Sequence, residues 1–471
     1  MKNNITLIII FVATLFSCSD EFLEPDPISF ISGDSFFTSE DELETAIINM
    51  YDGIQGVNST SSNDNHAIQV EFQLTEMRSD NTRTKASEGE QAQFERFDID
   101  ATNGVVADYY RSFYNVIYRA NVVLANIDVA SEARKGAFEG EAKFVRAYAY
   151  YNLVRLFGDL PLVDRIITPA EEDISFTRVP TSQIYELIVA DLEIAVANLD
   201  NSYKNRASKA AAETLLAKVH LTLKNYATAQ TLLESVMASG FSLEPEFKDV
   251  FYNENNSEVI FAIGYIGDNA EESQNFSAEW LNAVGRTSGI NYLTDEAKLI
   301  LDEKGGNRTP YSYRIDTEQP TQHQVVKYLP DGDASLGIDP TAGDPTLAGN
   351  DWIVLRYADV LLMHTEAIMA GQPTTGNAAA IASFQAVRDR AGLTDPVANI
   401  SLQDLLDERR VELAFENHRL FDLIRLGVAE NVLGDFAEDN GYSFSVTDLL
   451  LPIPELEIGL SKGKMRQNDG Y

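Results

Sequence analysis

One uninterrupted apolar stretch, residues 141–157, constrains the fold more than any other part of the chain. It contains no Pro or Gly, and Gly158 follows it with Pro161 just beyond, as at the end of a helix. Its few polar side chains fall on two opposite sides of a helix, so apolar and aromatic residues cover nearly everything else. Burying each ring, such as Phe144 or Tyr148, stabilises the fold by about 1.5–3 kcal/mol. The stretch therefore predicts a core helix enclosed by other helices, and not a functional site.

The charge of the chain limits its partners. Of 471 residues, 73 are acidic and 36 are basic, which gives a net charge of −37. Such a surface repels nucleic-acid phosphates and anionic headgroups and favours neutral ligands. The 20 Tyr and 24 Phe residues supply enough apolar area for a large folded core. We therefore expect a folded protein without a nucleic-acid partner.

The single cysteine, Cys18, follows an apolar run (Ile5–Phe16) that begins after Lys2. A charged start and a short apolar segment predict an export signal over residues 1–17, since a membrane-spanning helix needs about 20 apolar residues. The residues before Cys18 resemble a bacterial lipobox, in which the cysteine becomes the acylated first residue. The alternative is an ordinary signal peptide with an incidental cysteine. With no second thiol, no internal disulfide can form.

Residues 18–37 contain two prolines and no helical period, and we interpret them as a tether. We expect residues 38–471 to form a single domain. It opens with a helix, because Ser39 and Glu42 make a capping box and Gly56 ends the periodic run. Helical spacing predicts further helices over residues 105–127 and 180–199.

Two antiparallel helix pairs, near residues 208–239 and 354–390, have tetratricopeptide character. Because their period is irregular, we expect a degenerate repeat array. His220 falls on a packed face, which favours a buried histidine over a ligand. The charge-rich segment 407–425 predicts a helix pair with buried or half-buried ion pairs.

Between the two pairs the chain changes character. Residues 258–263 are β-branched and aromatic and predict a short strand. The following residues, about 264–351, are rich in Gly, Asn, Asp and Pro, and predict a long irregular insertion. A stretch of that length without regular structure is usually functional.

The chain resembles the SusD/RagB family of outer-membrane lipoproteins of Bacteroidetes-type bacteria. Four segments carry the resemblance: Cys18 with the acidic Ser-Asp-Glu that follows it, residues 140–163 ending in Arg-Leu-Phe-Gly-Asp-Leu-Pro-Leu-Val, residues 408–425, and the Pro-Ile-Pro and Gln-Asn-Asp-Gly-Tyr ending. The resemblance implies a mainly α, SusD-like fold with tetratricopeptide-like pairs and a loop-rich insertion containing short strands. It also implies a surface-exposed lipoprotein, anchored through Cys18, that captures neutral poly- or oligosaccharide and delivers it to a SusC-like TonB-dependent transporter.

Sugars present apolar faces and hydroxyl edges, so a site for them needs an exposed ring with polar side chains beside it. The family's two ligand regions correspond here to a loop before the 105–127 helix and to the insertion. The candidate glycan-binding residues are Asp80, Asn81, Arg83, Phe97 and Asp98 in the first region and Trp280, Arg286 and Tyr292 in the second. Family members often have Trp where this chain has Phe97. We expect Trp280 to form one wall of a glycan platform, with the alternative that it anchors the insertion to the core.

Two other classes of function remain as alternatives. A tetratricopeptide adaptor would bind only protein, whereas a glycan-cleaving enzyme would need two carboxylates about 5–10 Å apart. The five His residues form no metal-binding spacing, and the chain has no Gly-rich phosphate loop and no Gly-x-Ser-x-Gly motif. We therefore predict no catalytic residues, no cofactor and no metal, and rank the enzyme last.

Overall fold

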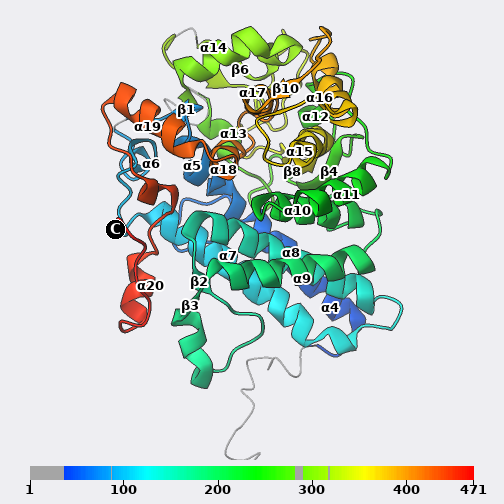
Figure 1. Cartoon of the computed structure of the whole chain (residues 1–471). Coiled ribbons are helices and arrows are strands. Elements are labelled where there is room, and N and C mark those ends of the chain that lie inside the picture. Colours follow the sequence, from blue (N-terminus) through cyan, green and yellow to red (C-terminus); the bar gives the residue numbers. More distant parts are fainter. Residues whose placement is uncertain (1–36, 86, 282–289, 317–318) are drawn as a thin grey trace, which may run out of the picture.

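The computed structural model describes residues 37–85, 87–281, 290–316 and 319–471. Long helices make up the lower half of the molecule in Figure 1, and shorter helices, short strands and loops make up the upper half. The lower half contains α4 (Glu40–Gln55), α7 (Gly104–Ala125), α8 (Lys135–Phe157) and α9 (Thr181–Asn198). Helices are the main elements of the described chain, and its strands are only two to five residues long, which confirms the predicted mainly α fold.

Helix α8 is the core helix that the sequence predicts. It packs between α7 and α9 and starts before residue 141, at Lys135. Phe144 is fully buried, and its ring centroid lies 5.2 Å from that of Phe261. The polar side chains of α8 are paired: Glu141 accepts hydrogen bonds from Tyr51 and Arg206, and Arg146 binds Asp191.

Helix α4 begins and ends where the sequence predicts. Ser39 caps its N-terminus, and Glu42 completes the capping box. Gly56 follows α4 with a φ of 71°, and a Cβ atom there would lie 2.2 Å from the carbonyl oxygen of His66. A glycine is therefore required where α4 gives way to the loop of residues 57–65.

The two tetratricopeptide-like pairs are α10 (Lys209–Thr222) with α11 (Tyr226–Met237), and α15 (Tyr357–Met369) with α16 (Ala378–Arg390). Helix α11 also packs against α15, so the pairs are stacked. The predicted start of the second pair, at residue 354, is wrong. Residues 354–356 belong to β8 (Trp352–Arg356), because their backbone pairs with that of β4 (Val259–Ile263).

The insertion begins and ends at this antiparallel β4–β8 pair. It is less irregular than the sequence predicts, because it contains the ten-residue helix α14 (Asp295–Lys304). Its other elements are α13 (Phe276–Glu279), β5 (Tyr292–Leu293), η6 (Gly306–Tyr311), β6 (Tyr313–Arg314) and β7 (Gln324–Val325).

The charge-rich segment forms the predicted helix pair, α17 (Leu402–Glu412) and α18 (Arg419–Arg425), and its ion pairs are buried. Arg356 lies at their centre: its guanidinium donates to Glu258, Glu412 and Glu416 at 2.6–2.8 Å. Two cations of the insertion bind the same helix pair, since Arg308 donates to Glu408 and Glu412 and Lys327 donates to Glu416.

The C-terminal part adds α19 (Ala429–Asn440), η7 (Val446–Leu449) and α20 (Glu455–Leu460). The remaining short elements connect the larger ones: η2 (Ala67–Val70), α5 (Glu71–Thr75), η3 (Glu76–Arg78), β1 (Thr82–Arg83), α6 (Ala92–Arg96), η4 (Ile127–Val129), β2 (Leu160–Pro161), η5 (Pro169–Phe176), β3 (Arg178–Val179), α12 (Asp249–Tyr252), β9 (Thr374–Thr375) and β10 (Ile400–Ser401). Within the described ranges, no helix has the length and apolar character needed to cross a bilayer.

Candidate functional site

An open groove of about 460 Å³ lies where the loop of residues 57–65, α5, the start of α7 and α13 meet. We call it the polar groove, because most of its lining residues carry an amide, hydroxyl, imidazole or carboxylate group. Its polar residues are Asn58, Ser59, Thr60, Ser62, His66, Gln69, Gln73, Glu90, Gln91, Asp108, Asn275 and Glu279. Phe72 and Phe276 form a largely buried apolar floor.

The polar groove is rich in hydrogen-bond acceptors and poor in positive charge. Among the described residues that line it, none is Lys or Arg. Glu90 accepts from the backbone N–H of Gly104 at 3.1 Å, and Glu279 accepts from Asn275 at 3.1 Å. Such a lining suits a ligand that donates hydroxyl hydrogen bonds and repels an anionic one.

A loop of residues 57–65 forms one wall of the polar groove and is tied to the body at both ends. Asn58 donates to Ser273 at 2.9 Å and to the carbonyl oxygen of Thr346 at 2.8 Å. At the other end, Arg111 of α7 donates to the backbone carbonyl oxygen of Ser62 at 3.2 Å. The wall is therefore an ordered part of the site.

Next to the polar groove, the structure joins the two candidate regions that the sequence placed far apart. Strand β1 pairs with β5, so that Arg83 lies opposite Tyr292. Arg83 and Tyr442 both donate to Glu95, at 3.2 and 2.9 Å. Tyr292 is part-exposed, and partial burial raises its pKa. Ile290 lines the groove, and Tyr292 follows it by two residues, which span at most about 7 Å of backbone.

The prediction that Trp280 is exposed as a glycan platform is wrong. Its side chain is only 1% exposed, and its ring lies 5.2 Å from that of Phe72 and 5.7 Å from that of Phe415. The alternative interpretation holds: Trp280 anchors the insertion to the core, because a ring of this size gains more by burial there than by exposure.

Asp80 and Asn81 are also buried, which contradicts their assignment to an exposed site. Burial alone would raise the pKa of Asp80, but Arg410 and Arg419 lower it well below its usual range, and Arg419 donates at 2.7 and 2.8 Å. Asn81 accepts from Arg410 at 2.8 Å. Asp80 and Asn81 therefore connect their own segment, between η3 and β1, to α17 and α18.

The other candidates divide in the same way. Phe97 is buried against Phe436 and Phe444, whereas Asp98 is exposed and pairs with Arg96 at 3.2 Å. Arg286 and Cys18 lie outside the described residues. Of the candidates, Arg83, Tyr292 and Asp98 are thus accessible to a ligand.

Sequence reasoning missed several residues of this site. Glu95 and Tyr442 hold Arg83, and Gln73 and Asn275 line the polar groove. The polar composition of residues 58–65 is a signal for a loop, and it could have indicated that part of the wall. The others come from short helices and a distant C-terminal segment, and no spacing in the sequence connects them.

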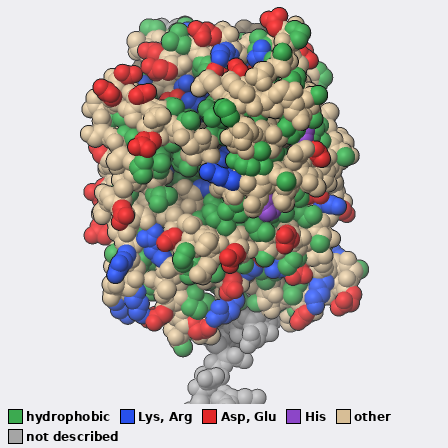
Figure 2. Space-filling view, viewed as in Figure 1, with side chains coloured by type: hydrophobic (Ala, Val, Ile, Leu, Met, Phe, Trp, Pro, Cys, Tyr) green, Lys and Arg blue, Asp and Glu red, His purple; other side chains and the backbone are tan. Residues whose placement is uncertain are grey.

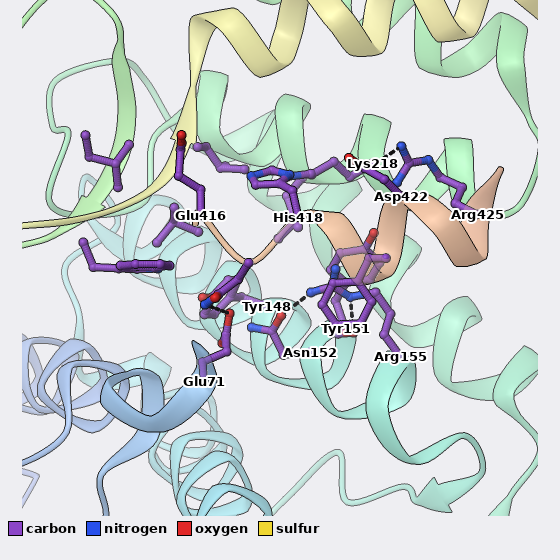
Figure 3. A pocket seen from close by; sticks show the side chains of 17 residues that line it. Glu71, Tyr148, Tyr151, Asn152, Arg155, Lys218, Glu416, His418, Asp422 and Arg425 are labelled. Carbon is purple, nitrogen blue, oxygen red and sulfur yellow. Dashed lines mark hydrogen bonds and ion pairs between the residues drawn. The ribbon is translucent and has the colours of Figure 1, made fainter. Parts of the chain in front are cut away.

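A second hollow, shown in Figure 3, lies between α8, α10, α18 and β8. Its volume is about 50 Å³, enough for one or two water molecules but not for a sugar ring. Charged side chains surround it in pairs, with Lys218 2.8 Å from Asp359 and Arg425 2.7 Å from Glu366. Burial, followed by Lys218, lowers the pKa of His418 to about 3, so His418 is neutral. We interpret this cavity as part of the core.

Acidic side chains are spread over the face shown in Figure 2, and apolar side chains gather at mid-height around α10.

In the part of the chain that the structure describes, no three His, Cys, Asp or Glu side chains cluster so that they could hold a metal ion.

The fold and the groove define a class: a helical-repeat scaffold that carries a loop-rich insertion and an open polar groove. The family model described as "SusD family" matches residues 296–471, and the model described as "Starch-binding associating with outer membrane" matches residues 21–221. The chain belongs to the SusD/RagB family.

The relatives agree with this assignment along the whole chain. SusD-like protein P2 of Formosa agariphila is 28% identical, with 100% of both chains covered. The SusD-like protein of Bacteroides ovatus is 27% identical over 90% of this chain and 82% of its own length. A solved laminarin-binding SusD-like protein has a TM-score of 0.76 and 26% identity, covering 92% of this chain and 100% of its own. Surface glycan-binding protein A of Bacteroides thetaiotaomicron, solved with laminarihexaose, shares the fold at a TM-score of 0.77 and 20% identity, covering 92% of this chain and 100% of its own.

Proposed function

We propose that this protein is a surface-exposed outer-membrane lipoprotein that binds a neutral poly- or oligosaccharide and delivers it to a SusC-like TonB-dependent transporter. The observation that carries the proposal is the polar groove, which is acceptor-rich and has no Lys or Arg among its described lining residues, with Tyr292 and Arg83 beside it. Hydroxyl groups of a neutral sugar donate to such a lining, and a part-exposed ring accepts the apolar face of a sugar.

The first probe is laminarin, because a structural relative is named as laminarin-binding. Changing Tyr292→Ala should weaken binding by about 1–3 kcal/mol, with ring stacking on other planar ligands as the guide. Titration calorimetry with laminarin and a panel of neutral polysaccharides measures the loss.

Tyr203→Ala is the matched control, since Tyr203 is 48% exposed and does not line the polar groove. It should bind like the wild type, and no sugar should be released over a long incubation. Equal affinity of both variants for the bound polysaccharide would remove Tyr292 from the site. Failure of every polysaccharide to bind would favour a protein-only adaptor, which the stacked tetratricopeptide-like pairs also support.

Attachment and partner are tested together by purification from native membranes. The wild type should fractionate with the outer membrane and bring down a β-barrel transporter in mild detergent. Cys18→Ala should release the protein into the soluble fraction, because acyl chains supply the proposed attachment. A Cys18→Ala variant that stays on the membrane at the wild-type level would contradict the lipid anchor, and recovery of the wild type alone in several mild detergents would contradict the partner.

A further inference from the structure

One hydrogen bond between the loop of residues 57–65 and the residues around it depends on the protonation of His66. His66 follows the loop, and its ring faces two acceptors. Nδ1 lies 2.6 Å from a carboxylate oxygen of Asp108, and Nε2 lies 2.9 Å from the backbone carbonyl oxygen of Ser59. A neutral imidazole has one N–H and satisfies only one of these contacts, whereas an imidazolium donates to both.

From this geometry we infer that the charged form of His66 positions the Ser59–Ser61 part of the groove wall, so that the shape of the polar groove depends on pH. Asn58 and Arg111 fix the two ends of the loop through hydrogen bonds in which His66 takes no part. Between those ends, the hydrogen bond that joins Ser59–Ser61 to the described residues outside the loop is the one from His66 to the Ser59 carbonyl.

The charged groups around His66 favour its protonation. Asp108 of α7 lies against the ring and Asp64 of the loop lies nearby, and both are acidic. Arg111 of α7 opposes them, but its guanidinium lies 3.2 Å from the other carboxylate oxygen of Asp108. The hydrogen bond that His66 Nδ1–H donates to Asp108 raises the pKa of His66 above 6.5, and burial opposes this shift.

The direction of the pH effect follows from this shift. A histidine whose pKa is raised by folding holds its contacts fully below the unfolded pKa and loses them as the pH rises through the folded pKa. Each unit by which closure of the loop raises the pKa of His66 corresponds to about a tenfold change in the equilibrium between the closed and the open loop. The wall should therefore be closed near pH 6 and loosen at alkaline pH.

The experiment that tests this inference has two parts, and the first part needs no ligand. The ¹⁵N and ¹³C shifts of the five histidines are followed between pH 5 and 9 in the purified protein. His66 should titrate above 6.5 and the other four below it, since burial lowers the pKa of His220, His323, His364 and His418. Hydrogen exchange of the peptide covering residues 57–66, corrected for intrinsic rates, should lose protection through the same midpoint.

Three variants test whether the hydrogen bond from His66 to the Ser59 carbonyl holds the loop through the charge of His66 or only through its shape. His66→Gln donates in one direction only, so its loop should be poorly protected at every pH. Asp108→Asn should move the midpoint to lower pH, and His220→Gln, far from the loop, should leave the wild-type profile unchanged. A wild-type loop whose protection is constant from pH 6 to 9, or a His66 that titrates at or below 6.5, would overturn the inference.

The second arm rests on the proposed function. The affinity for the polysaccharide that binds at pH 6 should fall severalfold by pH 9 in the wild type, and should be low and independent of pH in His66→Gln. An affinity that stays constant while the loop opens would overturn the coupling of the wall to the ligand. If no polysaccharide binds at any pH, the proposed function fails, while the exchange and shift measurements still decide the role of His66.

Discussion

Replacing Arg356 with alanine is expected to lower the free energy of unfolding by about 3–5 kcal/mol, the usual cost of removing one partner from buried ion pairs. Arg356 is 1% exposed, and its guanidinium binds Glu258, Glu412 and Glu416. Without it, these three buried carboxylates lose the cation that they share. Denaturant unfolding at pH 7 measures the change.

The deficit should shrink in acid, and the sign follows from the pKa values. Burial alone would raise the pKa of Glu416, but Arg356 and then Lys327 lower it below 4.5 in the wild type. A depressed carboxyl pKa contributes stability above the unfolded value and loses it as the pH falls through the folded one. The wild type therefore loses this contribution below about pH 4.5, whereas the variant has already lost it.

Arg165→Ala is the matched control, since Arg165 makes an exposed ion pair with Glu171. Its stability should stay near that of the wild type at all pH values, because exposed pairs contribute little. An Arg356→Ala protein as stable as the Arg165→Ala protein would contradict the description of the network as buried and mutually dependent.

The second large effect concerns the core helix. Phe144→Ala should cost about 3–5 kcal/mol, through lost burial and the cavity left behind. Phe144 is fully buried and packs edge-on against Phe261, which connects α8 to β4. The loss should therefore reach the insertion as well as the helices around α8.

Tyr118→Ala tests whether burial is the cause. Tyr118 lies on the adjacent helix α7 and is 54% exposed, so its removal should change stability by less than about 0.5 kcal/mol. Equal melting temperatures for the Phe144→Ala and Tyr118→Ala proteins would mean that α8 is not enclosed as described.

The long helices were predictable because their signals are local. The Ser39–Glu42 capping box, the apolar stretch around Phe144 and the charge pattern of residues 407–425 each act within a few residues, and the structure confirms all three. Residues 354–356 at the end of β8 were wrongly predicted as helix, because their pairing with β4, about 90 residues earlier in the chain, decides their structure. Helix propensity does not record such a partner.

The candidate site was harder to predict for the same reason. Tyr292 and Arg83 were found one by one, but their pairing across β1 and β5 is a tertiary contact. Trp280 was misplaced because polar neighbours suggested exposure, whereas Phe72 and Phe415, from opposite ends of the chain, enclose it. Glu95 and Tyr442 carry no signal beyond their residue types.

The β4–β8 pair has a consequence for how such a protein can change. Because the insertion leaves and re-enters the scaffold at one antiparallel ladder, its ends stay together whatever lies between them. A chimera could therefore exchange the segment between Ile263 and Trp352 for that of a relative without moving the helices beneath. Arg308 and Lys327 set the condition, since they neutralise Glu408, Glu412 and Glu416 from within the insertion. A donor segment is compatible only if it brings two cations to the same places.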